Sequence, residues 1–126
     1  MKEITLKKLA DIEAYAGPNA IDGIRFRPAR PALGISSWGM NVLELDPNCT
    51  SYPEHHHGSD NHEEVYVVLR GSVFLQAKGE EWRLDAGDMV RVAPPVSRKF
   101  VTREAGATLL ALGGTPGKPY EPSMGG

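Results

Sequence analysis

The chain has 126 residues, of which 40% are hydrophobic, and a formal net charge of -2 at pH 7. This length is enough for one hydrophobic core and short for two, so we expect a single domain. The small net charge gives no reason to expect a nucleic acid or an anionic membrane as a partner. The single cysteine, Cys49, excludes an internal disulfide and fits a reducing cytoplasm.

The N-terminal part, residues 1–33, is predicted to form an arm. Its first ten residues interleave charges with single apolar side chains, so we expect no signal peptide, and no run in the chain reaches membrane-spanning length. These features predict a cytoplasmic protein. Residues 6–15 are compatible with a short helix, because three of the apolar residues share one helical face. Within residues 17–33, three prolines and three arginines favour an arm packed along a barrel or a partner subunit over a central strand.

Residues 34–113 are predicted to form an all-β sandwich or barrel, because short alternating or apolar runs are separated by turn residues and helix-period stretches are scarce. Turn sequences at 78–80, 85–88 and 104–106 divide neighbouring runs. Residues 114–126 are rich in glycine and proline and are predicted to form an irregular tail. The expected strands are 35–45, 64–69, 72–77, 81–84, 89–93, 99–102 and 108–112.

All four histidines of the chain lie between residues 52 and 71, next to a pair of glutamates. His55 and His57 are two residues apart, so on an extended strand both rings project from the same face. Glu64 opens the next predicted strand. Two imidazoles and one carboxylate can converge on a divalent metal ion and leave other coordination positions open. The alternative is a polar surface loop. His62 has the same parity as Glu64 and is an alternative inward-facing ligand.

Residues 55–71 resemble the first signature of the cupin superfamily, which is His-x-His, a short gap, Glu, six residues and Gly. Glu64 and Gly71 match its second half. The gap between His57 and Glu64 is six residues, where the family has three or four, so we expect a longer hairpin loop. The resemblance implies a single cupin double-stranded β-helix, a jelly-roll barrel of the conserved-barrel type, with an N-terminal arm.

Residues 86–100 resemble the second cupin signature, which is Gly-Asp, four strand residues, Pro-x-Gly and then His. The match is partial, because Arg98 stands where the family supplies a third histidine ligand and Pro95 stands where glycine is usual. A guanidinium about 5 Å from a dication would cost roughly 6 to 7 kcal/mol of repulsion at an effective dielectric near 20. Three arrangements avoid this cost: Arg98 points toward the barrel mouth, an anionic ligand bridges it to the metal, or no metal binds and Arg98 pairs with Glu64.

The bridging arrangement would make Arg98 a substrate-binding residue, since a guanidinium binds a carboxylate through two hydrogen bonds. Tyr66 shares the face of Glu64 and is a second substrate-binding candidate, with a core aromatic residue as its alternative.

Two classes of function follow from the resemblance. In the first, His55, His57 and Glu64 hold one divalent iron, manganese, nickel or zinc ion in a metal-dependent dioxygenase or isomerase that acts on a small acidic molecule. In the second, the protein is a non-catalytic small-ligand binding or regulatory cupin that has lost the second-signature histidine, and Arg98 anchors the ligand. Either class implies a small anionic ligand. Small cupins commonly pair, so the resemblance also implies a homodimer, for which the arginine-rich arm is a candidate seam.

Overall fold

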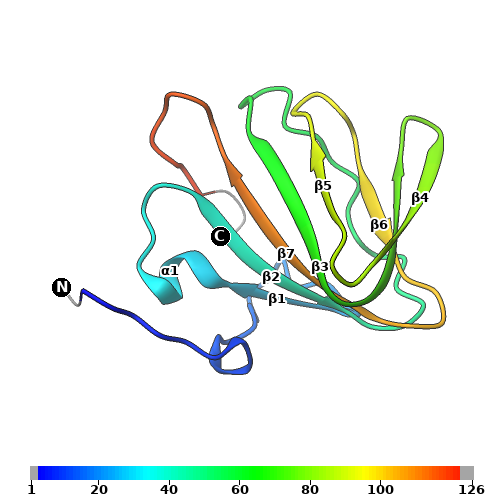
Figure 1. Cartoon of the computed structure of the whole chain (residues 1–126), viewed down its shortest axis with the longest axis horizontal. Coiled ribbons are helices and arrows are strands. Elements are labelled where there is room, and N and C mark those ends of the chain that lie inside the picture. Colours follow the sequence, from blue (N-terminus) through cyan, green and yellow to red (C-terminus); the bar gives the residue numbers. More distant parts are fainter. Residues whose placement is uncertain (1–2, 123–126) are drawn as a thin grey trace.

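A computed structural model describes residues 3–122 as an all-β molecule with two short helical segments (Figure 1). In chain order the elements are η1 (Leu9–Asp11), β1 (Ile24–Pro28), α1 (Ala29–Leu33), β2 (Gly39–Leu45), β3 (Glu63–Ala77), β4 (Glu80–Asp85), β5 (Met89–Val92), β6 (Lys99–Val101) and β7 (Ala107–Gly114). None of the helices among these residues is long and apolar enough to cross a membrane.

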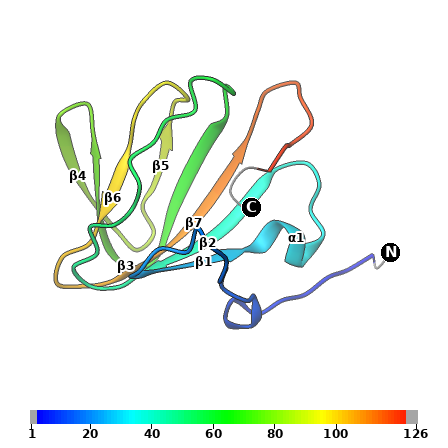
Figure 2. The same cartoon turned by 180° about the vertical axis from the view of Figure 1, so that it is seen from behind.

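Strand β3 is the central strand of the fold, because strands from both halves of the molecule pair with it. Its first half pairs with β7 on one side and with β5 on the other, and β7 continues the sheet through β2 to β1. Its second half pairs with β4 and β6. All these pairings are antiparallel. Figures 1 and 2, which view the molecule from opposite sides, show β4, β5 and β6 on one side of β3 and β1, β2 and β7 on the other.

The prediction of two strands at 64–69 and 72–77 is wrong, because both belong to the continuous strand β3. An irregularity in the pairing with β7 lies between Val68 and Arg70, where the strand bends from one half of the fold to the other. Gly71 follows at φ 75°, and a side chain here would collide with the carbonyl oxygen of Gly106. Only glycine fits this position, so the glycine of the first signature bends a strand rather than ending it.

The N-terminal region differs from the expected arm in two ways. The helix expected over 6–15 is reduced to the single 3-10 turn η1, and residues 24–28 form β1, which pairs with β2 at the edge of the sheet. Pro28 ends β1, in keeping with the edge and terminal positions that proline occupies in sheets. Helix α1 follows and stops at Gly34, which adopts the left-handed conformation at φ 81°. The next strand therefore starts at Gly39 instead of residue 35.

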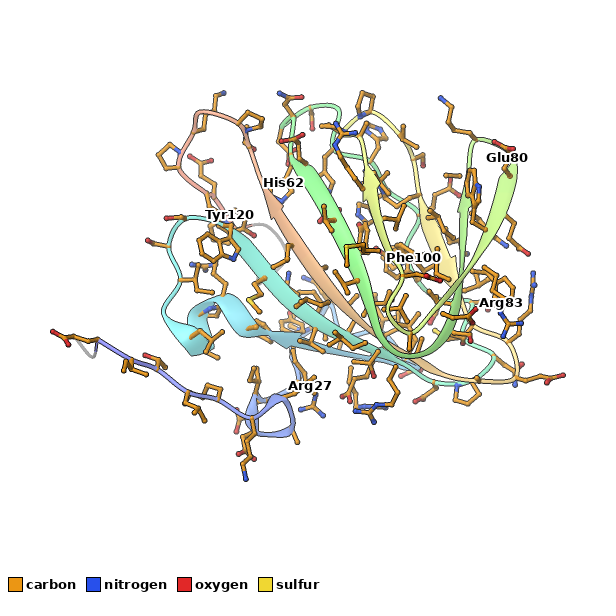
Figure 3. All side chains as sticks on the ribbon, in the orientation of Figure 1. Arg27, His62, Glu80, Arg83, Phe100 and Tyr120 are labelled. Carbon is orange, nitrogen blue, oxygen red and sulfur yellow. The ribbon has the colours of Figure 1, made fainter. Side chains whose placement is uncertain are left out.

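The remaining strands lie within a residue or two of their predicted bounds, and the expected turn at 78–80 is a tight hairpin with Lys78 and Gly79 at φ 54° and 72°. The hydrophobic core lies between the two halves of the fold. Phe100 is fully buried in this core, whereas Glu80 and Arg83 project outward from the β4 hairpin (Figure 3). Cys49 is a buried member of the same core and is not a ligand in the candidate site described below.

Candidate metal centre

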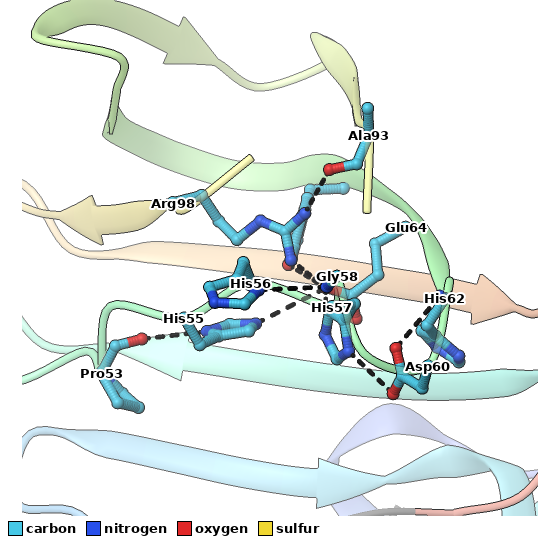
Figure 4. Close-up of polar contacts among 11 residues, drawn as sticks. Pro53, His55, His56, His57, Gly58, Asp60, His62, Glu64, Ala93 and Arg98 are labelled. Carbon is cyan, nitrogen blue, oxygen red and sulfur yellow. Dashed lines mark hydrogen bonds and ion pairs between the residues drawn. The ribbon is translucent and has the colours of Figure 1, made fainter. Parts of the chain in front are cut away.

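The two histidines of the first signature lie on a segment that two backbone contacts hold against the loop before β6. His55 forms an isolated antiparallel bridge with Arg98, and the amide of His57 donates a hydrogen bond of 2.7 Å to the carbonyl of Pro94. The prediction of a regular strand through both histidines is therefore wrong beyond this bridge. The predicted side-chain parity still holds, because both rings face the first residues of β3 (Figure 4).

The Nε2 atoms of His55 and His57 approach the same carboxylate oxygen, Glu64 Oε1, at 3.6 and 3.2 Å. One ligand atom from each of these three residues lies within 4.8 Å of the others. Three donors at this spacing, all from side chains that are only partly exposed, have the size and composition of a site for a single divalent metal ion.

The hydrogen bonds of the two imidazoles determine which nitrogen faces the carboxylate. His55 Nδ1 lies 3.0 Å from the carbonyl oxygen of Pro53, which can only accept, so this nitrogen carries the proton. His57 Nδ1 lies 3.2 Å from a carboxylate oxygen of Asp60. Both Nε2 lone pairs then point at Glu64, and His57 Nε2 is buried without a hydrogen-bond partner. Only a cation between these groups, a metal ion or a proton on an imidazole, relieves the repulsion. Metal-binding histidines use this same outer arrangement.

Asp60 is a site residue that the sequence analysis missed. It lies in the long loop between the histidines and β3; one of its oxygens contacts His57 Nδ1 and the other accepts a hydrogen bond of 3.1 Å from the amide of His62. Burial alone would raise the pKa of Asp60, but these two hydrogen bonds outweigh it and lower the pKa. The available signal was an aspartate three residues after His57 in a Ser-Asp-Asn turn.

The other two histidines lie outside the ligand group. His56 is exposed, and its Nδ1 accepts a hydrogen bond of 3.0 Å from the amide of Gly58. The ring of His62 faces inward, 5.0 Å from the ring of His57, yet its nitrogens are not among the three clustered ligand atoms. Burial lowers the pKa of His62. His62 therefore lines the same cavity as the ligands, which we describe next, without being one of them in this structure.

Arg98 is fully buried behind Glu64. One guanidinium nitrogen lies 3.3 Å from Glu64 Oε1 and another donates a hydrogen bond of 3.1 Å to the carbonyl of Ala93. The arrangement in which Arg98 points toward the barrel mouth is therefore wrong. Burial by itself would raise the pKa of Glu64, but in the metal-free site contacts with protonated His55 and His57 and the hydrogen bond from Tyr66 outweigh it and lower the pKa to about 2. Glu64 is thus held as a carboxylate.

Tyr66 completes the surroundings of Glu64, because its hydroxyl donates a hydrogen bond to Glu64 Oε1. Tyr66 and its neighbour Tyr52 are both almost fully buried, and burial raises the pKa of each phenol. Both therefore remain neutral and can donate hydrogen bonds. Tyr66 lines the cavity in front of the histidines, whereas Arg98 does not.

A cavity of about 210 Å³ opens in front of the ligand group, between β1, β2, β7 and the start of β3. Residues outside the two signatures supply much of its wall. The lining residues, in chain order, are Tyr15, Asn19, Ala20, Ile21, Ile24, Phe26, Gly39, Asn41, Leu43, Tyr52, Pro53, His55, His57, His62, Glu64, Tyr66, Ala111, Gly113 and Tyr120.

This fold and site can be compared with known proteins. A sequence profile described as the cupin domain matches residues 41–112, which is more than half of the chain. The chain belongs to the cupin family. No curated protein matches the sequence of this cupin.

Solved cupin structures resemble this cupin closely in fold. A sugar phosphate isomerase of the cupin superfamily from Silicibacter pomeroyi is 27% identical, with a TM-score of 0.72 over 86% of this chain and 74% of the other. A cupin protein from Bacteroides fragilis is 21% identical, with a TM-score of 0.73 over 98% and 94%. A predicted oxalate decarboxylase from Thermotoga maritima is 17% identical, with a TM-score of 0.69 over 86% and 97%.

Proposed function

We propose that this cupin holds one divalent transition-metal ion with His55, His57 and Glu64 and acts there on a small anionic molecule. The observation that carries the proposal is the orientation of the imidazoles, because both Nδ1 atoms contact acceptors and both Nε2 atoms converge on Glu64. Imidazole and carboxylate donors suit iron, manganese, nickel and zinc. When bound, such an ion supplies Lewis-acid polarisation of an oxygen atom on the ligand.

The residues around the three candidate ligands hold these side chains in place. Tyr66 and Arg98 both donate hydrogen bonds to Glu64 Oε1, so they fix the carboxylate beside the histidines, and the hydrogen bond from Tyr66 favours its ionised form. Asp60 and the carbonyl of Pro53 fix the two imidazoles. Three protein donors leave coordination positions open toward the cavity, where a ligand can enter.

The charge of the buried group favours an anionic ligand. Arg98 balances the charge of Glu64, and the histidines are neutral when they bind a metal, so apart from the outer carboxylate of Asp60 the chain leaves the double positive charge of the ion uncompensated. A carboxylate or enolate in the open positions would compensate part of it. In this proposal Arg98 acts through Glu64, because its guanidinium does not line the cavity and both of its terminal nitrogens have partners in the protein.

We propose isomerase chemistry as the first reaction to examine and dioxygenase chemistry as the second. The similarity to a sugar phosphate isomerase at 27% identity supports the first, and the open three-donor site supports the second. A non-catalytic ligand-binding role is the alternative, in which the same site holds a ligand without turnover.

The decisive experiment measures the metal content of untagged protein, as purified and after reconstitution with iron, manganese, nickel and zinc, by inductively coupled plasma mass spectrometry. We expect about one ion per chain in the wild type, about one in the His56→Ala control, and loss of the ion in the double variant His55→Ala/His57→Ala. Equal metal in the double variant, or none in the wild type after reconstitution, would contradict the proposed site.

A further inference from the structure

The cavity has two chemically different ends. At one end lie His55, His57 and Glu64. The opposite wall is apolar and comes from β1, β2 and the loop before β1. We call it the apolar wall and define it as Ile21, Ile24, Phe26 and Leu43. Apart from the tyrosines and His62, the polar side chains between the two ends are Asn19, on the loop before β1, and Asn41, on β2.

The sheet carries small residues beneath the cavity. Gly39, Gly113 and Glu64 lie side by side on β2, β7 and β3, and Ala111 occupies the next inward position on β7. A side chain at Gly113 would collide with His62, and one at Gly39 would lie 2.6 Å from the hydroxyl of Tyr120. The glycines therefore let the side chains of His62 and Tyr120, which line the cavity, lie close against the sheet.

The volume of the cavity limits the size of the ligand that it can hold. A cavity of about 210 Å³ is smaller than the ≈ 300–1,000 Å³ of cavities that take drug-sized ligands. Neighbouring strands lie about 4.8 Å apart, so Leu43 of the apolar wall, two strands away from the strand β3 that carries Glu64, is about 10 Å from that strand across the sheet. A chelating group together with a body of about one ring spans this distance.

The lack of positively charged side chains in the described cavity lining argues against a phosphorylated sugar as the ligand. Among the described residues that line the cavity, none is lysine or arginine, and no helix begins there. A phosphate group placed away from the metal would thus lack the charged partners that phosphate sites use. Each buried sugar hydroxyl would also need a hydrogen-bond partner, which the apolar wall does not offer.

We infer that the ligand is a small carboxylic acid, with a second oxygen next to the carboxylate, whose apolar body of about one ring packs on the apolar wall. The inference deepens the proposed function and rests on it, because the carboxylate end needs the metal at His55, His57 and Glu64. The apolar end rests on an independent observation, the composition and size of the wall.

The test compares two acids that share one metal-binding end. Glycolate and mandelate are both 2-hydroxy acids, and mandelate adds a phenyl ring. Each is titrated calorimetrically into zinc-loaded protein, since zinc is redox-inactive. We expect mandelate to bind at least about tenfold more tightly than glycolate, because its ring leaves water for the apolar wall. Equal affinities, or tighter binding of glucose 6-phosphate than of mandelate, would overturn the inference.

A matched pair of variants locates the effect. Ile24→Thr places a hydroxyl on the apolar wall, and Ile35→Thr makes the same change at a half-buried residue that does not line the cavity. We expect Ile24→Thr to reduce the advantage of mandelate over glycolate at least about threefold while zinc content and glycolate affinity stay unchanged. Ile35→Thr should leave the advantage intact. An equal loss in both variants would contradict packing on this wall.

Zinc content, measured first, separates this inference from the proposed function. Zinc bound without preference for mandelate leaves the metal site standing and overturns the inference. Failure to bind zinc, or any of iron, manganese and nickel after reconstitution, overturns the metal site and the carboxylate end together. In that case benzyl alcohol and glycerol are titrated into the metal-free protein. Binding of benzyl alcohol alone would support the apolar wall, and absence of binding by both would overturn it.

Discussion

Asp60 connects the long loop of this cupin to its candidate metal centre. Its carboxylate contacts the Nδ1 atom of His57 and the amide of His62, so the loop sets the orientation of a ligand that it does not itself contain. Such outer contacts raise the basicity of a metal-binding imidazole and fix its tautomer. The two or three residues by which this loop exceeds the length usual in the family thus have a use in the site.

The variant Asp60→Asn tests this role, because it keeps the shape of the side chain and removes its charge. We expect metal to bind roughly 10–100-fold more weakly, measured by competition with a chromophoric chelator. The control is Asp11→Asn, at an exposed aspartate in η1, which should leave the affinity unchanged. An unaltered affinity in Asp60→Asn would show that His57 does not need this carboxylate.

We expect Arg98 to oppose metal binding and to support folding at the same time. Its buried positive charge lies beside Glu64, so a metal bound to Glu64 would be repelled by Arg98. Without Arg98, however, the partly buried carboxylate of the metal-free protein would lose its cationic partner. We expect Arg98→His to bind metal at least about tenfold more tightly, because it removes the repulsion and adds an imidazole at the position of the usual family ligand. The metal-free variant should be less stable, by about 3–5 kcal/mol, in urea unfolding.

The variant Arg98→Met separates these two effects, since methionine removes the charge without supplying a nitrogen ligand. Its metal-free form should lose about as much stability as that of Arg98→His, and its metal affinity should rise less. Equal affinities in the two variants would mean that the new histidine does not reach the metal. No gain in either would mean that a bound metal does not experience the charge of Arg98.

At the scale of elements, the edge strand β1 is joined to β2 by a group of charges as well as by the backbone. Glu44 on β2 accepts a hydrogen bond of 2.6 Å from Arg27 and one of 3.3 Å from Arg25, and its side chain is 16% exposed. The hydrogen bond from Arg27 lowers the pKa of Glu44 from its usual value of 4.5, despite an opposing effect of burial. Folding therefore favours the ionised carboxyl group.

The lowered pKa of Glu44 determines how the stability of the protein changes with pH. The stability that Glu44 contributes is complete above its unfolded pKa, near 4.5, and is lost as the pH falls through the lower folded value. We expect Glu44→Gln to lower the free energy of unfolding by about 1 kcal/mol at pH 7, and this difference to shrink below pH 4.5. Urea unfolding at both pH values measures it. The exposed Glu80→Gln is the control, and a difference that grows in acid would reverse the assignment.

Most of the strands could be predicted from the sequence because alternation and turn residues are local signals. The cupin-like spacing of His55, His57 and Glu64 predicted the ligand group, which the structure brings together. The bend at Gly71 could not be predicted in this way, since it depends on the carbonyl of Gly106, more than thirty positions away in the chain. From the local sequence alone, a glycine between two apolar runs predicts a turn.

The rest of the site escaped prediction for the same reason. Asn41 shares a strand with Glu44 and five non-polar residues and has the inward parity of Leu43, but only the pairing of β2 with β7 places it in the cavity. Tyr15 and Tyr120 reach the cavity from segments with no regular structure. Their positions depend on contacts between distant parts of the chain, which residue spacing does not encode.

For the molecule as a whole, the metal end and the apolar end of the cavity have different origins. The three candidate ligands lie within residues 41–112, which match the cupin domain, whereas Tyr15, Ile21, Ile24 and Tyr120 lie outside them. The shared barrel thus supplies the candidate metal-binding end, and the segments before and after it supply much of the wall against which we propose that the rest of the ligand packs. Differences in these flanking segments would change the ligand and leave the metal centre intact.

The arm before β1 gives the last prediction, which concerns the proposed homodimer. Residues near its start extend away from the body of the molecule (Figures 1 and 2), and the side chains of Ile4 and Leu6 are 84% and 80% exposed. Two apolar residues spaced by two lie on the same side of an extended segment, so a second copy of the chain could cover both. We expect a dimeric mass by light scattering at micromolar concentration.

The double variant Ile4→Ser/Leu6→Ser should shift this mass toward the monomer, because it removes the apolar contacts of the arm. Glu3→Ser/Thr5→Ser changes the two neighbouring residues, which lie on the opposite side of the extended segment, and should leave the dimer intact. A monomeric wild type would contradict the homodimer itself. A dimer that survives the loss of both apolar side chains would move the interface from the arm to the sheets, where Leu69, Trp82 and Met89 are exposed large apolar residues to substitute next.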